Sequence, residues 1–118
     1  MTDETLRRAH ELAAAWLEQL PERPVRPAGD PVGLRTALPE RGEEPAEVLD
    51  ALAAAAEPGL VASAGPRYFG FVTGGSLPAA LGADWLTSAW DQNAGLHAMS
   101  PAAEIGRASC RERVLTDV

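Results

Sequence analysis

The chain has 118 residues, of which 46% are apolar, and carries a net charge of −7. This length suits one small domain, and the acidic balance argues against a nucleic-acid partner, because such proteins present a basic surface to the phosphates. The single cysteine, Cys110, excludes an internal disulfide, and the lack of a membrane-spanning run or signal peptide leads us to expect a cytoplasmic protein.

A first amphipathic helix is predicted near the amino terminus. Its apolar residues recur at steps of three and four: Leu6, Ala9, Ala13, Trp16, Leu17 and Leu20. Thr2 or Asp3 can cap its start, and Pro21 ends it. His10 lies beside this stripe, and we interpret it as a solvated edge residue and not as a catalytic one.

The next segment, 21–45, is rich in proline. It contains six of the ten prolines of the chain: Pro21, Pro24, Pro27, Pro31, Pro39 and Pro45. An extended stretch of this length is unusual inside a compact domain, so we expect it to lie across another surface. A disordered linker fits the composition equally well.

A second helix is predicted from Pro45, which suits the first turn, to Pro58-Gly59, which ends it. Its apolar face consists of Val48, Leu49, Leu52, Ala53 and Ala56. Residues 67–72 indicate a short extended aromatic stretch. After the turn 73–76, Ser76 can cap a third helix that buries four large residues: Leu81, Trp85, Leu86 and Trp90. The fold is therefore expected to be mostly α, with three helices and a proline-rich arm.

Two polar clusters were considered as sites. The turn Thr73-Gly74-Gly75-Ser76 offers backbone N–H groups to an anion, although an ordinary capped turn uses the same residues. The other cluster follows the third helix and contains Asp91, Gln92, Asn93 and His97, for which a plain helix end is favoured. All ten basic side chains are arginines, so no Schiff base can form on this chain. The residues alone define no catalytic set and no metal site.

The stretch Gly65-Pro66-Arg67-Tyr68-Phe69-Gly70-Phe71-Val72-Thr73-Gly74-Gly75-Ser76-Leu77-Pro78 resembles the start of the group II pyridoxal-phosphate-dependent decarboxylases, relatives of aromatic-amino-acid and glutamate decarboxylases. In that family a "His-Pro-Arg/Tyr-Phe-Phe" string precedes a Ser/Thr-Gly turn and a helix. The resemblance covers residues 5 to 103. Its flanking matches are Val25-Arg26-Pro27, Leu34-Arg35, Leu38-Pro39, Ala83 to Ser88, and Asn93 through Ser100-Pro101-Ala102-Ala103.

The resemblance implies an α/β parent enzyme of fold-type I, similar to aspartate aminotransferase, that acts on an amino acid as a homodimer. It implies amino-terminal helices and an arm in residues 1–64, packed over the partner subunit, and the start of the decarboxylase domain in 65–103. Phe71, Val72 and Thr73 match the segment that lines the family's substrate pocket, and Asn93 and Gly95 match a loop that reaches the partner's site. Substrate preference does not transfer, because relatives have tyrosine or glutamine where Phe71 stands.

The family's catalytic and cofactor-binding residues lie in a large domain that follows these segments. The resemblance therefore implies pyridoxal phosphate for the parent enzyme, while this chain contributes no cofactor-binding residue and is expected to be inactive. Residues 104–118 depart from the family pattern, and Glu104 to Val114 resemble the translation of a sequencing adapter. We therefore expect an artefactual tail, with a disordered native tail as the alternative.

Two further interpretations stay open at this point. The chain fits a stand-alone helical interaction or dimerisation module. Much of its apolar content is alanine, so we expect a thin core that needs a partner surface. It also fits a fragment of another fold-type I enzyme, such as an aldehyde synthase or an aminotransferase.

Overall fold

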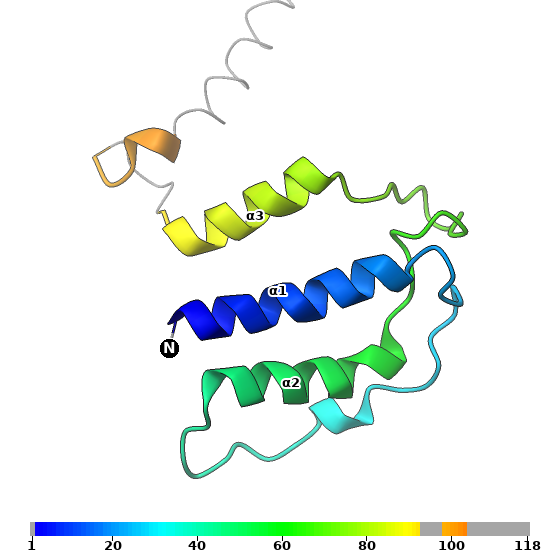
Figure 1. Cartoon of the computed structure of the whole chain (residues 1–118), viewed down its shortest axis with the longest axis horizontal. Coiled ribbons are helices and arrows are strands. Elements are labelled where there is room, and N and C mark those ends of the chain that lie inside the picture. Colours follow the sequence, from blue (N-terminus) through cyan, green and yellow to red (C-terminus); the bar gives the residue numbers. More distant parts are fainter. Residues whose placement is uncertain (1, 93–97, 104–118) are drawn as a thin grey trace, which may run out of the picture. The chain divides into compact units, whose positions relative to one another are not determined.

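The computed structural model describes residues 2–92 and 98–103. Within these ranges the chain forms three α-helices and no strand: α1 (Thr2–Gln19), α2 (Pro45–Ala56) and α3 (Pro78–Trp90) (Figure 1). Single 3₁₀ turns occupy Val32–Leu34, Glu57–Gly59 and Pro101–Ala103. The predicted mostly α fold is confirmed. The contacts divide the chain into two compact units, Met1–Gly75 and Ser76–Val118.

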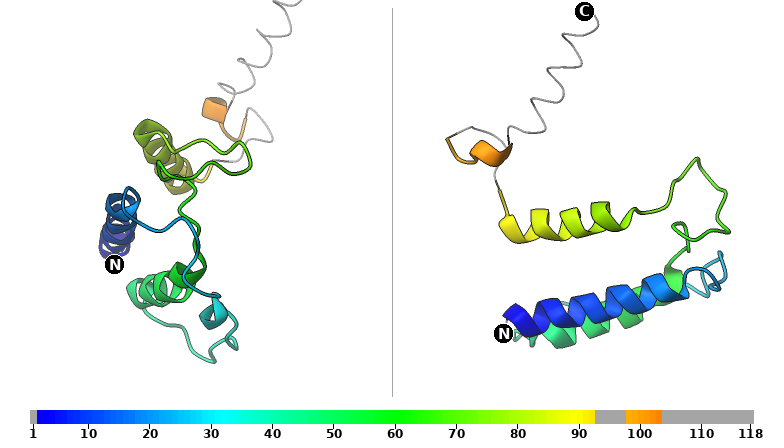
Figure 2. Two further views of the ribbon diagram at one scale, coloured as in Figure 1. Left: turned by 90° about the vertical axis from the view of Figure 1, so that its right-hand side faces the viewer. Right: turned by 45° about the horizontal axis from the view of Figure 1, so that its top comes forward.

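In the first unit, α1 and α2 lie side by side and run in the same direction (Figures 1 and 2). The parallel arrangement is possible because the long segment between them returns the chain to the starting end. Helix α1 begins at Thr2. Asp3 therefore lies inside the first turn and does not occupy the cap position that was predicted for it. Helix α2 begins at Pro45 as predicted, and Glu44 precedes it without a capping side-chain hydrogen bond.

The middle of the proline-rich segment packs against α2. The Gly29 N–H donates a hydrogen bond to the Pro58 carbonyl over 2.8 Å. A Cβ at Gly33 would lie 3.0 Å from the Cβ of Ala55, so only a glycine allows this approach without displacing α2. The segment that we expected to cross another surface therefore crosses α2 of its own unit, while residues 35–45 are exposed.

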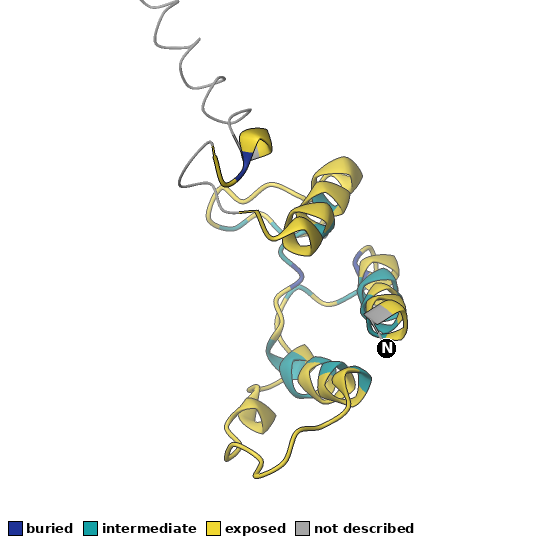
Figure 3. Ribbon diagram, turned by 90° about the vertical axis from the view of Figure 1, so that its left-hand side faces the viewer, coloured by how far each residue is buried: buried dark blue, intermediate teal, exposed yellow. Residues whose placement is uncertain are grey.

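The first unit has almost no buried apolar core. Among the described residues of the chain, only Leu20 and Ala62 are buried apolar side chains, at 7% and 1% exposure. The facing sides of α1 and α2 are half-buried, whereas their outer surfaces are exposed (Figure 3). The thin core expected from the alanine-rich composition is thus observed, and two helices alone bury too little surface for high stability.

In the second unit, α3 begins at Pro78 with Leu77 in the cap position, so the prediction that Ser76 caps the helix is wrong. The helix buries none of its residues: Leu81 and Trp85 are half-buried, and Leu86 and Trp90 are 50% and 62% exposed. Their predicted burial is not seen, because the described residues of the second unit provide no surface that covers them. No helix in the described ranges combines the length and the apolar character needed to cross a membrane.

Candidate functional site

The segment that resembles the family's substrate-lining stretch is a tight turn and not the extended aromatic stretch that the sequence predicts for residues 67–72. Phe71 and Val72 have φ angles of 52° and 54°, in the left-handed region that a β-branched residue rarely adopts. The Thr73 N–H donates to the Gly70 carbonyl over 3.2 Å and closes the turn. Without a neighbouring strand in the described residues, no ladder of backbone hydrogen bonds favours the extended conformation here.

This turn, Phe69 to Thr73, presents apolar side chains to the solvent. Phe69, Phe71 and Val72 are 93%, 95% and 105% exposed, and Thr73 is exposed as well. Of the predicted substrate-binding residues, Phe71, Val72 and Thr73 therefore share one turn, whereas Asn93 and Gly95 lie outside the described residues. The three turn residues are not among those that line the groove between α1 and α2.

The base of the turn is attached to the carboxyl-terminal end of α1. The Arg67 guanidinium donates from Nη2 to the Arg23 carbonyl over 2.8 Å. A Cβ at Gly65 would lie 3.1 Å from the Leu20 carbonyl oxygen, and the Ala62 N–H donates to the Val25 carbonyl over 3.3 Å. Residues 62–67 are therefore held close to residues 20–25.

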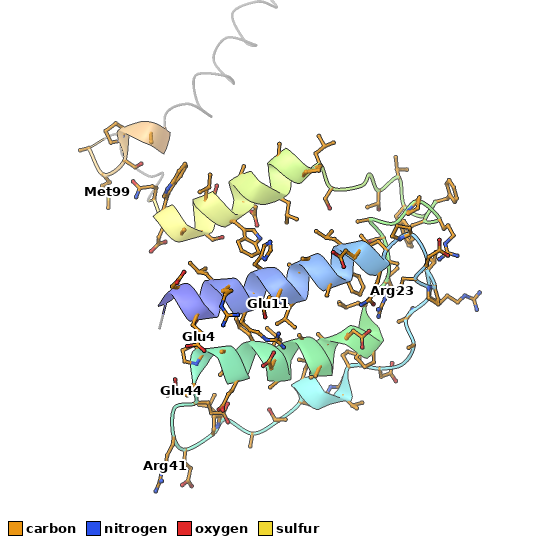
Figure 4. The ribbon with its side chains drawn as sticks, viewed as in Figure 1. Glu4, Glu11, Arg23, Arg41, Glu44 and Met99 are labelled. Atoms are coloured by element: carbon orange, nitrogen blue, oxygen red, sulfur yellow. The ribbon has the colours of Figure 1, made fainter. Side chains whose placement is uncertain are left out.

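Arg23 itself is fixed by several contacts, which we call the Arg23 junction (Figure 4). Its guanidinium lies over the Trp16 ring, 4.4 Å from the centroid, and its Nη1 donates to Gln19 Oε1 over 3.1 Å. Its Nη2 pairs with Glu57 Oε1 over 2.8 Å and reaches the Glu57 carbonyl at 3.4 Å. The Arg23 side chain is only 14% exposed, so the junction connects the ends of α1 and α2 in a partly dry environment.

A second feature of the first unit was not predicted as a site. A groove of about 650 Å³ runs between α1 and α2 and is mostly apolar. Its lining includes Ala9, Leu12, Trp16, Leu49, Ala53 and Leu60. The sequence shows the apolar faces of both helices. The groove depends on how far apart α1 and α2 pack, and no pattern within either helix predicts that distance.

Charged residues border this groove. Arg8 pairs with Asp50 over 2.6 Å and with Glu11 over 3.0 Å, and Arg7 pairs with Glu11 over 2.6 Å. The hydrogen bonds to Asp50 and then to Glu11 raise the pKa of Arg8 above its ordinary value. The hydrogen bond from Arg8 is the largest cause that lowers the pKa of Glu11. These groups are solvated ion pairs, which stabilise the helices modestly and offer no poised acid or base.

The residues present do not fit a covalently held pyridoxal phosphate, because the chain contains no lysine. Among the described residues, no group of three or more histidine, cysteine, aspartate or glutamate side chains could hold a metal ion. Comparison with protein families, with curated proteins and with solved structures finds no match to this chain.

Proposed function

We propose that the chain is the amino-terminal part of a pyridoxal-phosphate-dependent amino-acid decarboxylase and is catalytically inactive by itself. In this proposal the parent enzyme is a fold-type I homodimer, and the large domain supplies the catalytic lysine and the cofactor site. The chemistry of the bound cofactor would be that of an electron sink for the carbanion left by loss of CO₂. Phe71, Val72 and Thr73, together with Asn93 and Gly95, would contribute to the substrate pocket of the assembled enzyme.

The observation that carries this proposal is the string Pro66-Arg67-Tyr68-Phe69-Gly70-Phe71, which is followed by Thr73-Gly74-Gly75-Ser76 and then by α3. The exposed apolar side chains of Phe69, Phe71 and Val72 support it, because such a group costs solvation free energy unless another surface covers it. The open groove between α1 and α2 supports it in the same way. Both features suit a segment that is completed by further polypeptide.

The test is decarboxylation by the complete reading frame. We expect the full-length product, supplied with pyridoxal phosphate, to release CO₂ from at least one L-amino acid in a panel of aromatic and acidic substrates. The 118-residue chain is the matched control and should release none. A full-length product that binds the cofactor but transfers amino groups or forms aldehydes would replace the decarboxylase with another fold-type I enzyme.

The groove between α1 and α2 also favours a second candidate, a stand-alone helical module that pairs with another helix. A helix with apolar residues at steps of three and four could occupy a groove of this kind. Size-exclusion chromatography with light scattering separates the two candidates. A monodisperse dimer of the 118-residue chain would support the module, whereas a folded monomer would support the fragment.

A further inference from the structure

We infer that Arg67 is a positioning residue that holds the turn Phe69–Thr73 at the end of the α1–α2 pair through the backbone carbonyl of Arg23. The contact is a charge-assisted hydrogen bond from Nη2 of Arg67 over 2.8 Å. The use proposed for the turn, which is to face the substrate, depends on the proposed function. The attachment itself does not depend on it.

The turn needs such an attachment because its conformation is strained. Phe71 and Val72 both have left-handed φ angles, and their side chains make no compensating contact because they are exposed. Residues in such conformations persist only where the surrounding structure holds them. One backbone hydrogen bond, from Thr73 to Gly70, closes the turn, and it lies inside the strained segment.

The attachment has a restrained acceptor. The Arg23 side chain is held by Trp16 and Gln19 of α1 and by Glu57, just beyond the end of α2, which restricts the movement of the Arg23 carbonyl. Arg67 therefore transmits the position of the helix ends to the residues that follow it. Within that stretch Tyr68 folds back over Gly70, whose Cβ, if present, would lie 2.7 Å from the Tyr68 hydroxyl oxygen.

The sequence of contacts thus runs from the two helices to Arg23, from Arg23 to Arg67, and from Arg67 into the turn. Removal of the Arg67 guanidinium should release the turn while the helix pair stays intact, because its hydrogen bond goes to the backbone of Arg23, beyond the end of α1, and not to a side chain of either helix. Replacement of a neighbouring arginine outside this path should leave both the turn and the helix pair in place. Arg26 is exposed and forms no hydrogen bond or ion pair with the described residues, so Arg26→Ala is the matched control.

Dipolar electron paramagnetic resonance on the full 118-residue chain tests this inference, with Cys110→Ser to remove the native thiol. One label pair, Glu18→Cys and Thr73→Cys, reports the turn relative to α1, and a second pair, Glu18→Cys and Ala51→Cys, reports the helix pair. We expect Arg67→Ala to lose the single narrow distance peak of the first pair and to preserve that of the second. Arg67→Lys, which keeps a cationic donor, should restore the peak, and Arg26→Ala should leave both pairs unchanged.

The inference is overturned if Arg67→Ala leaves the first peak narrow, if it broadens both pairs alike, or if the first pair is already broad in the unsubstituted chain. The measurement uses no substrate and no cofactor. Its failure would therefore leave the proposed decarboxylase untouched, and the failure of the CO₂ assay would leave the attachment standing.

Discussion

The guanidinium of Arg23 lies over the indole ring of Trp16, 4.4 Å from the ring centroid, at the point where α1 ends. A cation in this position is attracted by the electron-rich face of the ring. The same guanidinium pairs with Glu57 just beyond the end of α2. One side chain thus joins the ends of both helices, and it does so in a unit with almost no buried core, where a single polar junction matters more than usual.

Replacement of Arg23 should therefore weaken the helix pair. We expect Arg23→Ala to lower the free energy of unfolding by about 1 to 2 kcal/mol, from the loss of the aromatic contact and of an ion pair that is shielded on the Arg23 side only. Thermal unfolding followed by circular dichroism measures the effect. Arg26→Ala removes the same charge from an exposed position that has no partner among the described residues, and it should be close to neutral. Equal losses in both variants would refute the role of the junction.

The contact between Gly59 and Pro31 should be intolerant of a methyl group. A Cβ at Gly59 would lie 2.7 Å from Cδ of Pro31, and a proline ring cannot rotate away as a flexible side chain can. We expect Gly59→Ala to cost about 1 to 3 kcal/mol of stability. Gly42→Ala is the control, because a Cβ there meets nothing within 4 Å. A neutral Gly59→Ala would show that the proline-rich segment does not pack on α2 as described.

Replacement of the glycine within α3 should raise stability, in contrast to the replacement of Gly59. Gly82 lies inside Pro78–Trp90, and a Cβ at this position would meet nothing within 4 Å. Gly82→Ala should stabilise the helix by about 1 kcal/mol, because alanine loses less backbone freedom on helix formation. The helical signal at 222 nm should rise accordingly. A fall in that signal would mean that a neighbouring surface occupies the space beside Gly82.

The pH dependence of the first unit should include Glu11. Its pKa is lowered in the folded chain by the Arg8 hydrogen bond, so the folded state binds a proton less readily than the unfolded state. The stabilisation is therefore present above the ordinary pKa of 4.5 and is lost as the pH falls through the lower folded value. Glu11→Gln should remove this part of the acid sensitivity. A pH profile of thermal stability that is the same in both proteins would contradict the assignment.

The helices were predictable because their signals are local. Proline in the first turn marks the start of α2 and of α3, at Pro45 and Pro78, and the spacing of apolar residues marks α1. The turn at Phe71 and Val72 was not predictable, because aromatic and β-branched residues favour an extended conformation and give no local signal for left-handed φ angles. The groove was also missed, because it depends on the parallel pairing of two helices that are separated by a long segment.

The candidate site was predicted only in part for a related reason. The resemblance placed Phe71, Val72 and Thr73 on one segment, and they do share one turn, but a pocket needs surfaces that the described residues do not provide. The Arg23 junction had no sequence signal beyond the presence of arginine near a proline. Its contacts arise from residues 16, 19, 57 and 67, which only the folded unit brings together.

The central claim is that the chain is the amino-terminal part of a larger enzyme, and the most direct test is to resequence the source DNA across the codons for Pro101 to Val118. We predict that the reading frame continues past Ala103 into a large domain that contains the Schiff-base lysine absent from this chain. Confirmation of the present tail, Glu104 to Val118, followed by a stop codon would contradict that claim and would leave the helical interaction module as the function to pursue.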